Sequence, residues 1–254
     1  MSNRRLSFWT VAMVVFAFRL FAQPATLSVQ LRTPAAQVSQ PSADLSGVWQ
    51  SLPQGGERHH FSTEQPPLTP WALDYFNYAK NPAIPMGRGR DELEPRYHCL
   101  PPGPTGLMLN PLPFEIIQSS KRVLLFHEHD HWIRQIWTDA REHPDGFPIT
   151  WMGHSIGHWD GGALVVDTVG INPISLWIDR AGTPHSDQLH VVERFSRPSQ
   201  DTLQVVFLFE DPKAYTRPWG GTKVYKLGED WEIQEHVVCE EQLIQQRGFR
   251  VDSR

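Results

Sequence analysis

The sequence predicts an all-β protein built as an antiparallel barrel of about eight to ten strands. Its 18 glycines and 22 prolines interrupt the 254 residues so often that long helices have little room. From Phe114 onward, short apolar segments follow one another with brief polar turns between them. Strand and helix patterns do not alternate, which argues against a parallel α/β sheet. Many antiparallel strands in succession favour closure into a barrel, because closure removes unpaired sheet edges.

The N-terminal residues are predicted to lie outside the barrel. Arg4 and Arg5 precede an apolar run that ends at the small residue Ala22, the pattern of a secretory signal peptide over residues 1–22. A retained membrane anchor is the alternative, although the run is shorter than the roughly 20 residues of a spanning helix. Residues 23–43 are rich in Ala, Pro, Ser, Thr and Gln, which predicts a flexible leader. The mature protein is therefore expected to be periplasmic or secreted, without a membrane span.

The predicted barrel domain covers residues 44–241 and begins with a short strand at residues 45–49. Residues 51–113 are dominated by loops and are expected to hold one or two short helices. Thr69 is a suitable N-cap and Pro70 suits a first helical turn, so a helix is predicted up to Lys80.

Further segments have the length and apolar content of strands. They are residues 114–118, 122–128, 132–138, 154–159, 163–168, 188–195, 202–210, 222–227 and 231–238. Asp160-Gly161-Gly162 is a strong hairpin turn between two of them. Residues 242–254 are predicted to form a C-terminal tail.

The chain has two cysteines, Cys99 and Cys239. In an oxidising compartment such a pair is most simply joined in one disulfide. The bond would tie the last predicted strand to the proline-rich residues 99–104, which are predicted to be neither helix nor central strand. Two unpaired buried thiols are the alternative. A cysteine-based metal site is disfavoured, because neither cysteine lies in a Cys-x-x-Cys pair.

The overall charge disfavours nucleic acid as a partner. Lys and Arg number 23 and Asp and Glu 28, a formal net charge of -5, whereas binding to phosphates needs a basic surface. With 10 Trp and 13 Phe, the chain is instead expected to bind a small hydrophobic or aromatic molecule.

Several sequence runs carry a resemblance to known proteins. Gly47-Val48-Trp49 resembles the Gly-x-Trp opening of lipocalins and related calycin barrels. Longer runs resemble a large group of uncharacterised exported bacterial proteins that are expected to form lipocalin-like barrels. These runs are Ile136–Arg141, Trp151–Thr168, Pro184–Arg194, Asp211–Thr216 and Cys239–Glu241. The resemblance implies the barrel and the export, but it implies no reaction.

The segment His127-Glu-His-Asp-His131 has the most suggestive spacing of histidines. On one strand, three alternating imidazoles would share a face and could bind zinc or copper. The segment also fits a solvated turn between two strands, which is the favoured interpretation, so no metal ligand is assigned. Gly153-His-Ser-Ile-Gly157 spells Gly-x-Ser-x-Gly, but it lies in a strand pattern without a following helix, which disfavours a serine hydrolase.

Charged residues inside apolar strands indicate where chemistry could occur. Glu193 shares strand parity with Leu189, Val191 and Phe195, so its carboxylate is expected to face the interior. A buried carboxylate needs a partner, and Arg134 or Arg141 could supply the positive charge. Such an ion pair could equally be structural alone.

The leading hypothesis is an exported enzyme that performs acid–base chemistry on an apolar or ring-containing small molecule inside the barrel. The reaction would be an isomerisation, cyclisation, hydration or elimination. His185 would move the proton, Glu193 or Asp139 would orient it, and Arg134 or Arg141 would stabilise developing negative charge.

The predicted substrate contacts come from strand ends and from the polar loop of residues 179–187. They are Glu128, Trp137, Trp159 and Asp179. No cofactor is expected. Two other functions remain open: a carrier that binds a hydrophobic ligand without changing it, and an enzyme that holds zinc or copper through its histidines.

Overall fold

The computed structural model describes residues 43–51, 60–80, 99–174, 177–237 and 239. The predicted signal peptide, the tail and all but the last residue of the predicted leader lie outside these residues. Among the described residues, none of the helices has the length and apolar character needed to cross a membrane.

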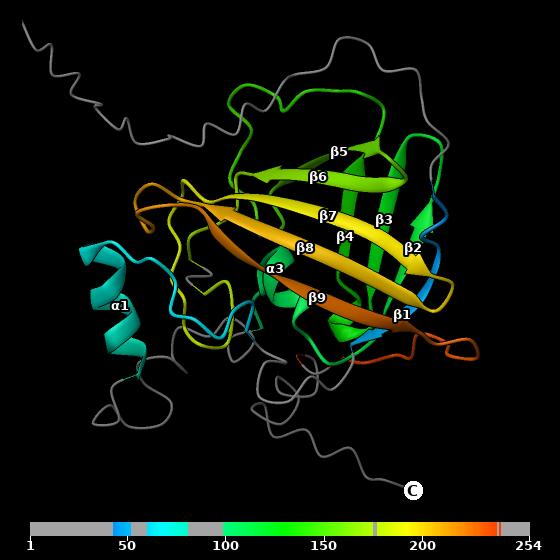
Figure 1. The fold of residues 1–254 in the computed structure, drawn as a ribbon, viewed down its shortest axis with the longest axis horizontal. Helices are drawn as coiled ribbons and strands as arrows, with labels where there is room; N and C mark the ends of the chain where they lie inside the picture. Colours follow the sequence, from blue (N-terminus) through cyan, green and yellow to red (C-terminus); the bar gives the residue numbers. More distant parts are fainter. Residues whose placement is uncertain (1–42, 52–59, 81–98, 175–176, 238, 240–254) are drawn as a thin grey trace, which may run out of the picture. The chain divides into compact units, whose positions relative to one another are not determined.

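Nine strands form a closed barrel in which each strand pairs with the next and β9 pairs with β1. The strands are β1 (Gly47–Ser51), β2 (Phe114–Gln118), β3 (Arg122–His127), β4 (Ile133–Trp137), β5 (His154–Asp160), β6 (Ala163–Val169), β7 (His190–Ser199), β8 (Thr202–Glu210) and β9 (Trp219–Leu227). In Figure 1, β6 to β9 run side by side across the front, while β2, β3 and β4 cross behind them at a steep angle. The predicted all-β barrel is confirmed.

One neighbouring pair departs from the predicted antiparallel arrangement. β4 and β5 pair in parallel, with Ile136 opposite Ser155 and Trp137 opposite Ile156. The prediction of a purely antiparallel barrel is therefore wrong for this pair. Each antiparallel pair reverses the strand direction, so a closed ring of nine strands must contain an odd number of parallel pairs. Residues 138–153 form the long connection that a parallel pair requires.

The predicted last strand does not form. Residues 231–237 have no regular secondary structure and lie outside the sheet. They lie across the turn between β3 and β4, where Asp130 N–H donates to the His236 carbonyl (2.9 Å) and Gln234 N–H donates to Glu128 Oε2 (3.0 Å). The barrel is already closed by the β9–β1 pair, so this segment finds no free edge to join.

In the described part of the chain, two helices precede β2. α1 (Pro70–Lys80) begins as predicted, with Ala72 N–H donating to Thr69 Oγ1 (3.3 Å). α3 (Gly103–Met108) overlaps the proline-rich stretch that was expected to form no helix. That expectation is wrong because Pro104 lies in the first turn, where its missing N–H leaves no hydrogen bond unmade.

Large side chains fill the inside of the barrel. On β8, Leu203, Val205, Phe207 and Phe209 are buried, whereas the alternate residues Val206 and Leu208 are exposed, as the period of two predicts. The largest fully buried side chains include Trp49, Arg134, Tyr225, Phe114 and Phe195. The interior is thus a packed core into which a few polar groups are built.

Candidate functional site

A buried ion pair joins β4 to β7 inside the barrel. Arg134 Nη1 donates to Glu193 Oε1 (2.9 Å), Nη2 donates to Glu193 Oε2, and each side chain is only 1% exposed. Arg134 Nη2 also donates to Thr168 Oγ1 (2.9 Å), and Nε and Nη2 each donate to Ser155 Oγ (3.3 Å). The pairing that sequence parity predicted for Glu193 is therefore present. Because water does not reach these groups and their charges are satisfied, the pair acts as part of the core.

Two further polar rings lie near this pair. Burial lowers the pKa of His127 to about 3, helped by the positive charges of Arg134 and His129. Burial, together with the negative charge of Glu193, raises the pKa of Tyr225. Both rings are therefore neutral near pH 7 and do not titrate there.

Five titratable side chains form a hydrogen-bonded series on the outer face of the barrel, which we call the outer-face chain. His143 comes from the connection before β5, and His154, Asp167, His190 and Glu210 come from β5, β6, β7 and β8. The series runs His154 Nδ1 to His143 Nδ1 (2.8 Å), His143 Nε2 to Asp167 Oδ1 (3.1 Å), Asp167 Oδ1 to His190 Nε2 (2.9 Å), and His190 Nδ1 to Glu210 Oε2 (3.0 Å). It therefore spans four neighbouring strands.

Strand alternation places these groups on the outside. Val166 and Thr168 are buried within the barrel, so Asp167 between them points outward. The same parity turns His190 away from buried Val191.

The surroundings of His190 favour its protonated form. Each of its ring nitrogens faces a carboxylate oxygen, which only accepts hydrogen bonds, so an imidazolium can donate on both sides. The hydrogen bond to Asp167 raises the pKa of His190 against partial burial, and Glu210 adds to the rise. Partial burial alone would raise the pKa of Asp167, but its bonds with His190 and His143 lower it below the usual value.

The outer-face chain is buried at one end, at His154, and is exposed to solvent at Asp167. Burial lowers the pKa of His154, with the charges of His143 and Arg141 adding to the effect, and the Phe147 ring lies 4.7 Å from its ring. The Asp167 side chain, in contrast, is 41% exposed. Its Oδ1 accepts from two histidines, whereas Oδ2 accepts no hydrogen bond from any described residue. An external molecule can therefore meet the chain at Asp167 Oδ2.

Three of the predicted site residues, Trp137, Asp139 and Arg141, lie beside His154, the buried end of the outer-face chain. Arg141 donates to Asp139 through Nε (2.8 Å) and Nη2 (2.6 Å), and its guanidinium lies 3.5 Å from the centre of the Trp137 ring. The hydrogen bond from Arg141 lowers the pKa of Asp139. The charge of Arg141 also lowers the pKa of His154, so the exposed cluster of Trp137, Asp139 and Arg141 adjoins the outer-face chain.

The predicted partnership of His185 with Glu193 or Asp139 is not formed. His185 is buried, and its Nδ1 lies 2.9 Å from the Ser186 carbonyl oxygen. The carboxylate of Glu193 binds Arg134, and that of Asp139 binds Arg141. Asp179, a predicted substrate contact, accepts the N–H groups of Ala181 (3.1 Å) and Thr183 (3.2 Å) and so shapes its own loop, and burial raises its pKa.

Two other predicted substrate contacts, Glu128 and Trp159, make contacts that stabilise the fold. Glu128 is buried, and its Oε2 accepts from Trp231 Nε1 (3.3 Å) and from Gln234 N–H (3.0 Å), so it fastens the segment after β9. Trp159 is partly buried against the core.

The histidine-rich segment forms a turn, as predicted, but the expectation that the turn is solvated is wrong. His127, Glu128 and His129 are buried, and the segment after β9 lies across the turn. His127 ends β3, and η3 (His129–His131) makes a short 3₁₀ turn before β4. Within the described residues, no group of three or more His, Cys, Asp or Glu side chains has the geometry of a metal site.

The two cysteines lie next to each other, and the structure draws no disulfide between them. Cys99 Sγ lies 3.5 Å from the Cys239 carbonyl oxygen. Burial raises the pKa of Cys239 to about 12, and the neighbouring Cys99 adds to the rise. The thiol of Cys239 is therefore uncharged at neutral pH.

We expect Cys99 and Cys239 to be joined in a disulfide when the protein is prepared from an oxidising compartment. Closing a separation of 140 residues would restrict the unfolded chain and stabilise the fold by about 5 kcal/mol. Non-reducing peptide mapping should find the linked peptides, and Cys99→Ser should lower the free energy of unfolding by a similar amount. Two freely alkylated thiols in the unfolded, unreduced protein would contradict this expectation.

Stability should depend on pH through the outer-face chain. The pKa of His190 is raised in the folded state, so its contribution is fully present below its unfolded pKa of about 6.5 and is lost as pH rises through the folded pKa. Urea unfolding of wild type and His190→Gln at about pH 5.5 and pH 9 should show the larger difference at the lower pH. A difference that does not change with pH would contradict the coupling.

The fold and the site together define a closed β-barrel protein that carries an imidazole–carboxylate chain on its outer face. Comparison of the amino-acid chain with protein-family models, curated proteins and solved structures finds no match in any of the three. The geometry of the site itself is therefore the basis for inferring a function.

Proposed function

We propose that this protein is an acid–base enzyme, of isomerase or lyase type, whose proton-transferring group is the outer-face chain. The observation that carries the proposal is the environment of Asp167. Two histidines hold its Oδ1, while Oδ2 is left toward solvent without a described partner. A carboxylate that is fixed in orientation and open on one oxygen is suited to exchange a proton with a bound molecule.

Each member of the chain has a role in this proposal. Asp167 is ionised at neutral pH because its pKa is lowered, so Oδ2 can take a proton from a carbon or hydroxyl of the substrate and return it to another atom. His143 and His190 donate to Oδ1 and hold the carboxylate in place. Asp167 itself, with a smaller contribution from Glu210, raises the pKa of His190 and so favours the form in which both of its N–H groups are donors.

The surroundings of Asp167 favour an apolar or ring-containing substrate. On the neighbouring strands, Val192 stands opposite Asp167 and Leu208 stands opposite Val192. Leu208 and Val206 are exposed on this face. Apolar surface beside an open carboxylate can hold the body of such a molecule while its acidic proton meets Oδ2. The reaction would take place on the outer face and not in the interior, because the buried Arg134–Glu193 pair is closed to solvent.

Deuterium exchange tests this function across a panel of candidate substrates. The protein is incubated in D₂O with cyclic ketones, lactones and unsaturated ring compounds, and deuterium uptake by each compound is followed by mass spectrometry. We expect at least one compound to gain deuterium faster than in buffer or with heat-unfolded protein. If no compound exchanges faster, and a hydrophobic molecule instead copurifies unchanged at one per chain, the protein is a carrier and the proposal is wrong.

A further inference from the structure

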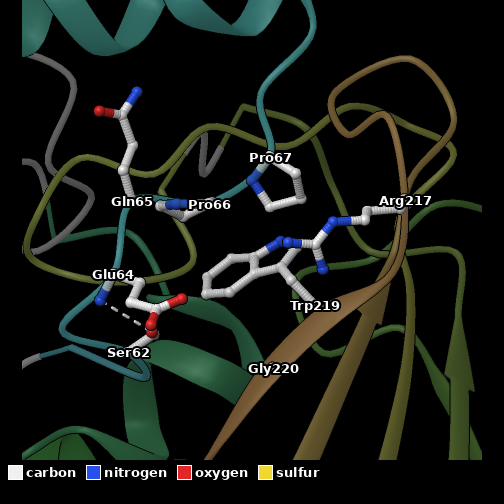
Figure 2. Close-up of a pocket in the computed structure, with 8 residues that line it drawn as sticks. All are labelled: Ser62, Glu64, Gln65, Pro66, Pro67, Arg217, Trp219 and Gly220. Atoms are coloured by element: carbon white, nitrogen blue, oxygen red, sulfur yellow. Dashed lines mark hydrogen bonds between the residues drawn. The ribbon is translucent and has the colours of Figure 1, made fainter.

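A second site lies apart from the outer-face chain, where residues 62–67 meet the start of β9. A pocket of about 160 Å³ opens there. Figure 2 shows its lining, which consists of Ser62, Glu64, Gln65, Pro66, Pro67, Arg217, Trp219 and Gly220. The volume is several times the roughly 30 Å³ that one water molecule occupies in the liquid, so the pocket has room for a small organic molecule.

The sequence builds this pocket from two distant segments. Thr216 N–H donates to the Pro67 carbonyl oxygen (2.8 Å), which ties the segments together. Gly221 allows the closest approach, because a Cβ at that position would lie 1.7 Å from the main-chain oxygen of Phe61. The pocket is therefore held by main-chain contacts.

Trp219 leaves a buried donor unused in the pocket wall. The side chain is only 7% exposed, and its ring packs 4.9 Å from Phe209 and 5.4 Å from Tyr215. Burial raises the pKa of Tyr215, and the nearby Trp219 N–H opposes the rise. The contact between the two groups nevertheless lacks hydrogen-bond geometry, and the Tyr215 hydroxyl donates to the Pro184 carbonyl (2.7 Å). Trp219 Nε1 is buried without a hydrogen-bond partner among the described residues. Because a buried N–H without an acceptor costs free energy, a ligand with an acceptor group would gain from meeting it.

The pocket also carries one charge of each sign. Arg217 and Glu64 both line it, and neither makes an ion pair with a described residue. In the view of Figure 2, the guanidinium and the carboxylate lie toward opposite ends of the Trp219 indole. A positive group, an aromatic ring and a negative group in this order complement a molecule with a carboxylate, an apolar body and an ammonium group.

We propose that this pocket binds a small zwitterion of the free amino-acid class. Its carboxylate would bind Arg217 and accept from Trp219 Nε1, and its ammonium group would bind Glu64. The apolar body would lie against the indole and the adjacent prolines. Arg217 is suited to this role because its planar guanidinium can donate two hydrogen bonds to one carboxylate.

Three related probes separate the contributions of the two charges. L-leucine carries both charges, N-acetyl-L-leucine carries only the carboxylate, and L-leucinamide carries only the ammonium group. Binding to the full chain is measured by calorimetry and by the shift of the Trp219 indole N–H signal, assigned with Trp219→Phe. We expect L-leucine to bind most tightly and both probes with a carboxylate to shift the indole signal.

Variants of the two charged residues should have opposite selectivity. Arg217→Gln is expected to lower the affinity for L-leucine and N-acetyl-L-leucine at least tenfold and to leave the affinity for L-leucinamide unchanged. Arg217→Lys should recover part of the lost affinity. Glu64→Gln should lower the affinity for L-leucine and L-leucinamide but not the affinity for N-acetyl-L-leucine. Arg122→Gln changes an exposed arginine on β3 and is the matched control, with no expected effect. The proposal is overturned if none of the three probes binds, or if each variant weakens all three equally.

Discussion

Replacing Glu193 with glutamine is expected to lower the free energy of unfolding by about 3–5 kcal/mol. The substitution leaves the Arg134 guanidinium, which is 1% exposed, without its counter-charge inside a packed barrel. An unpaired charge in such surroundings is costly, because water cannot replace the lost partner. Urea unfolding at pH 7, followed by tryptophan fluorescence, measures the change.

Two matched variants show whether the cost arises from the unpaired charge. The double variant Arg134→Met/Glu193→Met removes both charges and is expected to be less destabilised than Glu193→Gln. Asp160→Asn breaks an exposed ion pair with Arg194 and should cost less than about 1 kcal/mol. If Glu193→Gln costs no more than Asp160→Asn, the guanidinium is solvated and the interior is not sealed.

Replacing Asp167 with asparagine should slow proton exchange with a substrate by about 10²- to 10⁴-fold, the usual contribution of general acid–base catalysis. The amide has the size of the carboxylate and can still accept from one histidine, but it cannot take a proton at neutral pH. The rate of deuterium uptake by the substrate found in the screen measures this loss.

His158→Ala is the matched control for that loss. His158 is exposed on β5 and lies outside the outer-face chain, so its removal should leave the exchange rate unchanged. Melting temperatures of both variants check that the barrel stays folded. An Asp167→Asn rate within tenfold of wild type, with the fold intact, would remove Asp167 as the proton-transferring group.

Most of the fold could be predicted from local patterns. The boundaries of β2 and β8 agree with the predicted segments, because turn residues and alternating apolar residues define them locally. The parallel β4–β5 pair could not be predicted, because pairing across residues 138–153 has no local signal. The predicted strand at residues 231–238 had strand-like composition, but the β9–β1 pair closes the barrel without it.

The two polar networks differ in how far the sequence predicts them. Strand parity predicts that Glu193 faces the interior, and a buried carboxylate needs a positively charged partner. The ion pair with Arg134 could therefore be predicted from the sequence. The outer-face chain was missed because each member alone has the properties of an ordinary surface residue. Asp167 stands 24 residues from His143 and 23 from His190, and only the strand register brings the three together. The signal that was available is Asp167 itself, a carboxylate that interrupts the apolar run of β6.

The central claim is that the outer-face histidines and carboxylates form one coupled proton-exchanging unit. The most direct test is an NMR pH titration of the ¹⁵N-labelled imidazoles in wild type and Asp167→Asn. We predict that His190 in wild type keeps both ring nitrogens protonated above pH 6.5, the usual pKa of histidine, and that its pKa falls in Asp167→Asn. A His190 that titrates at or below about 6.5 in both proteins would contradict the claim.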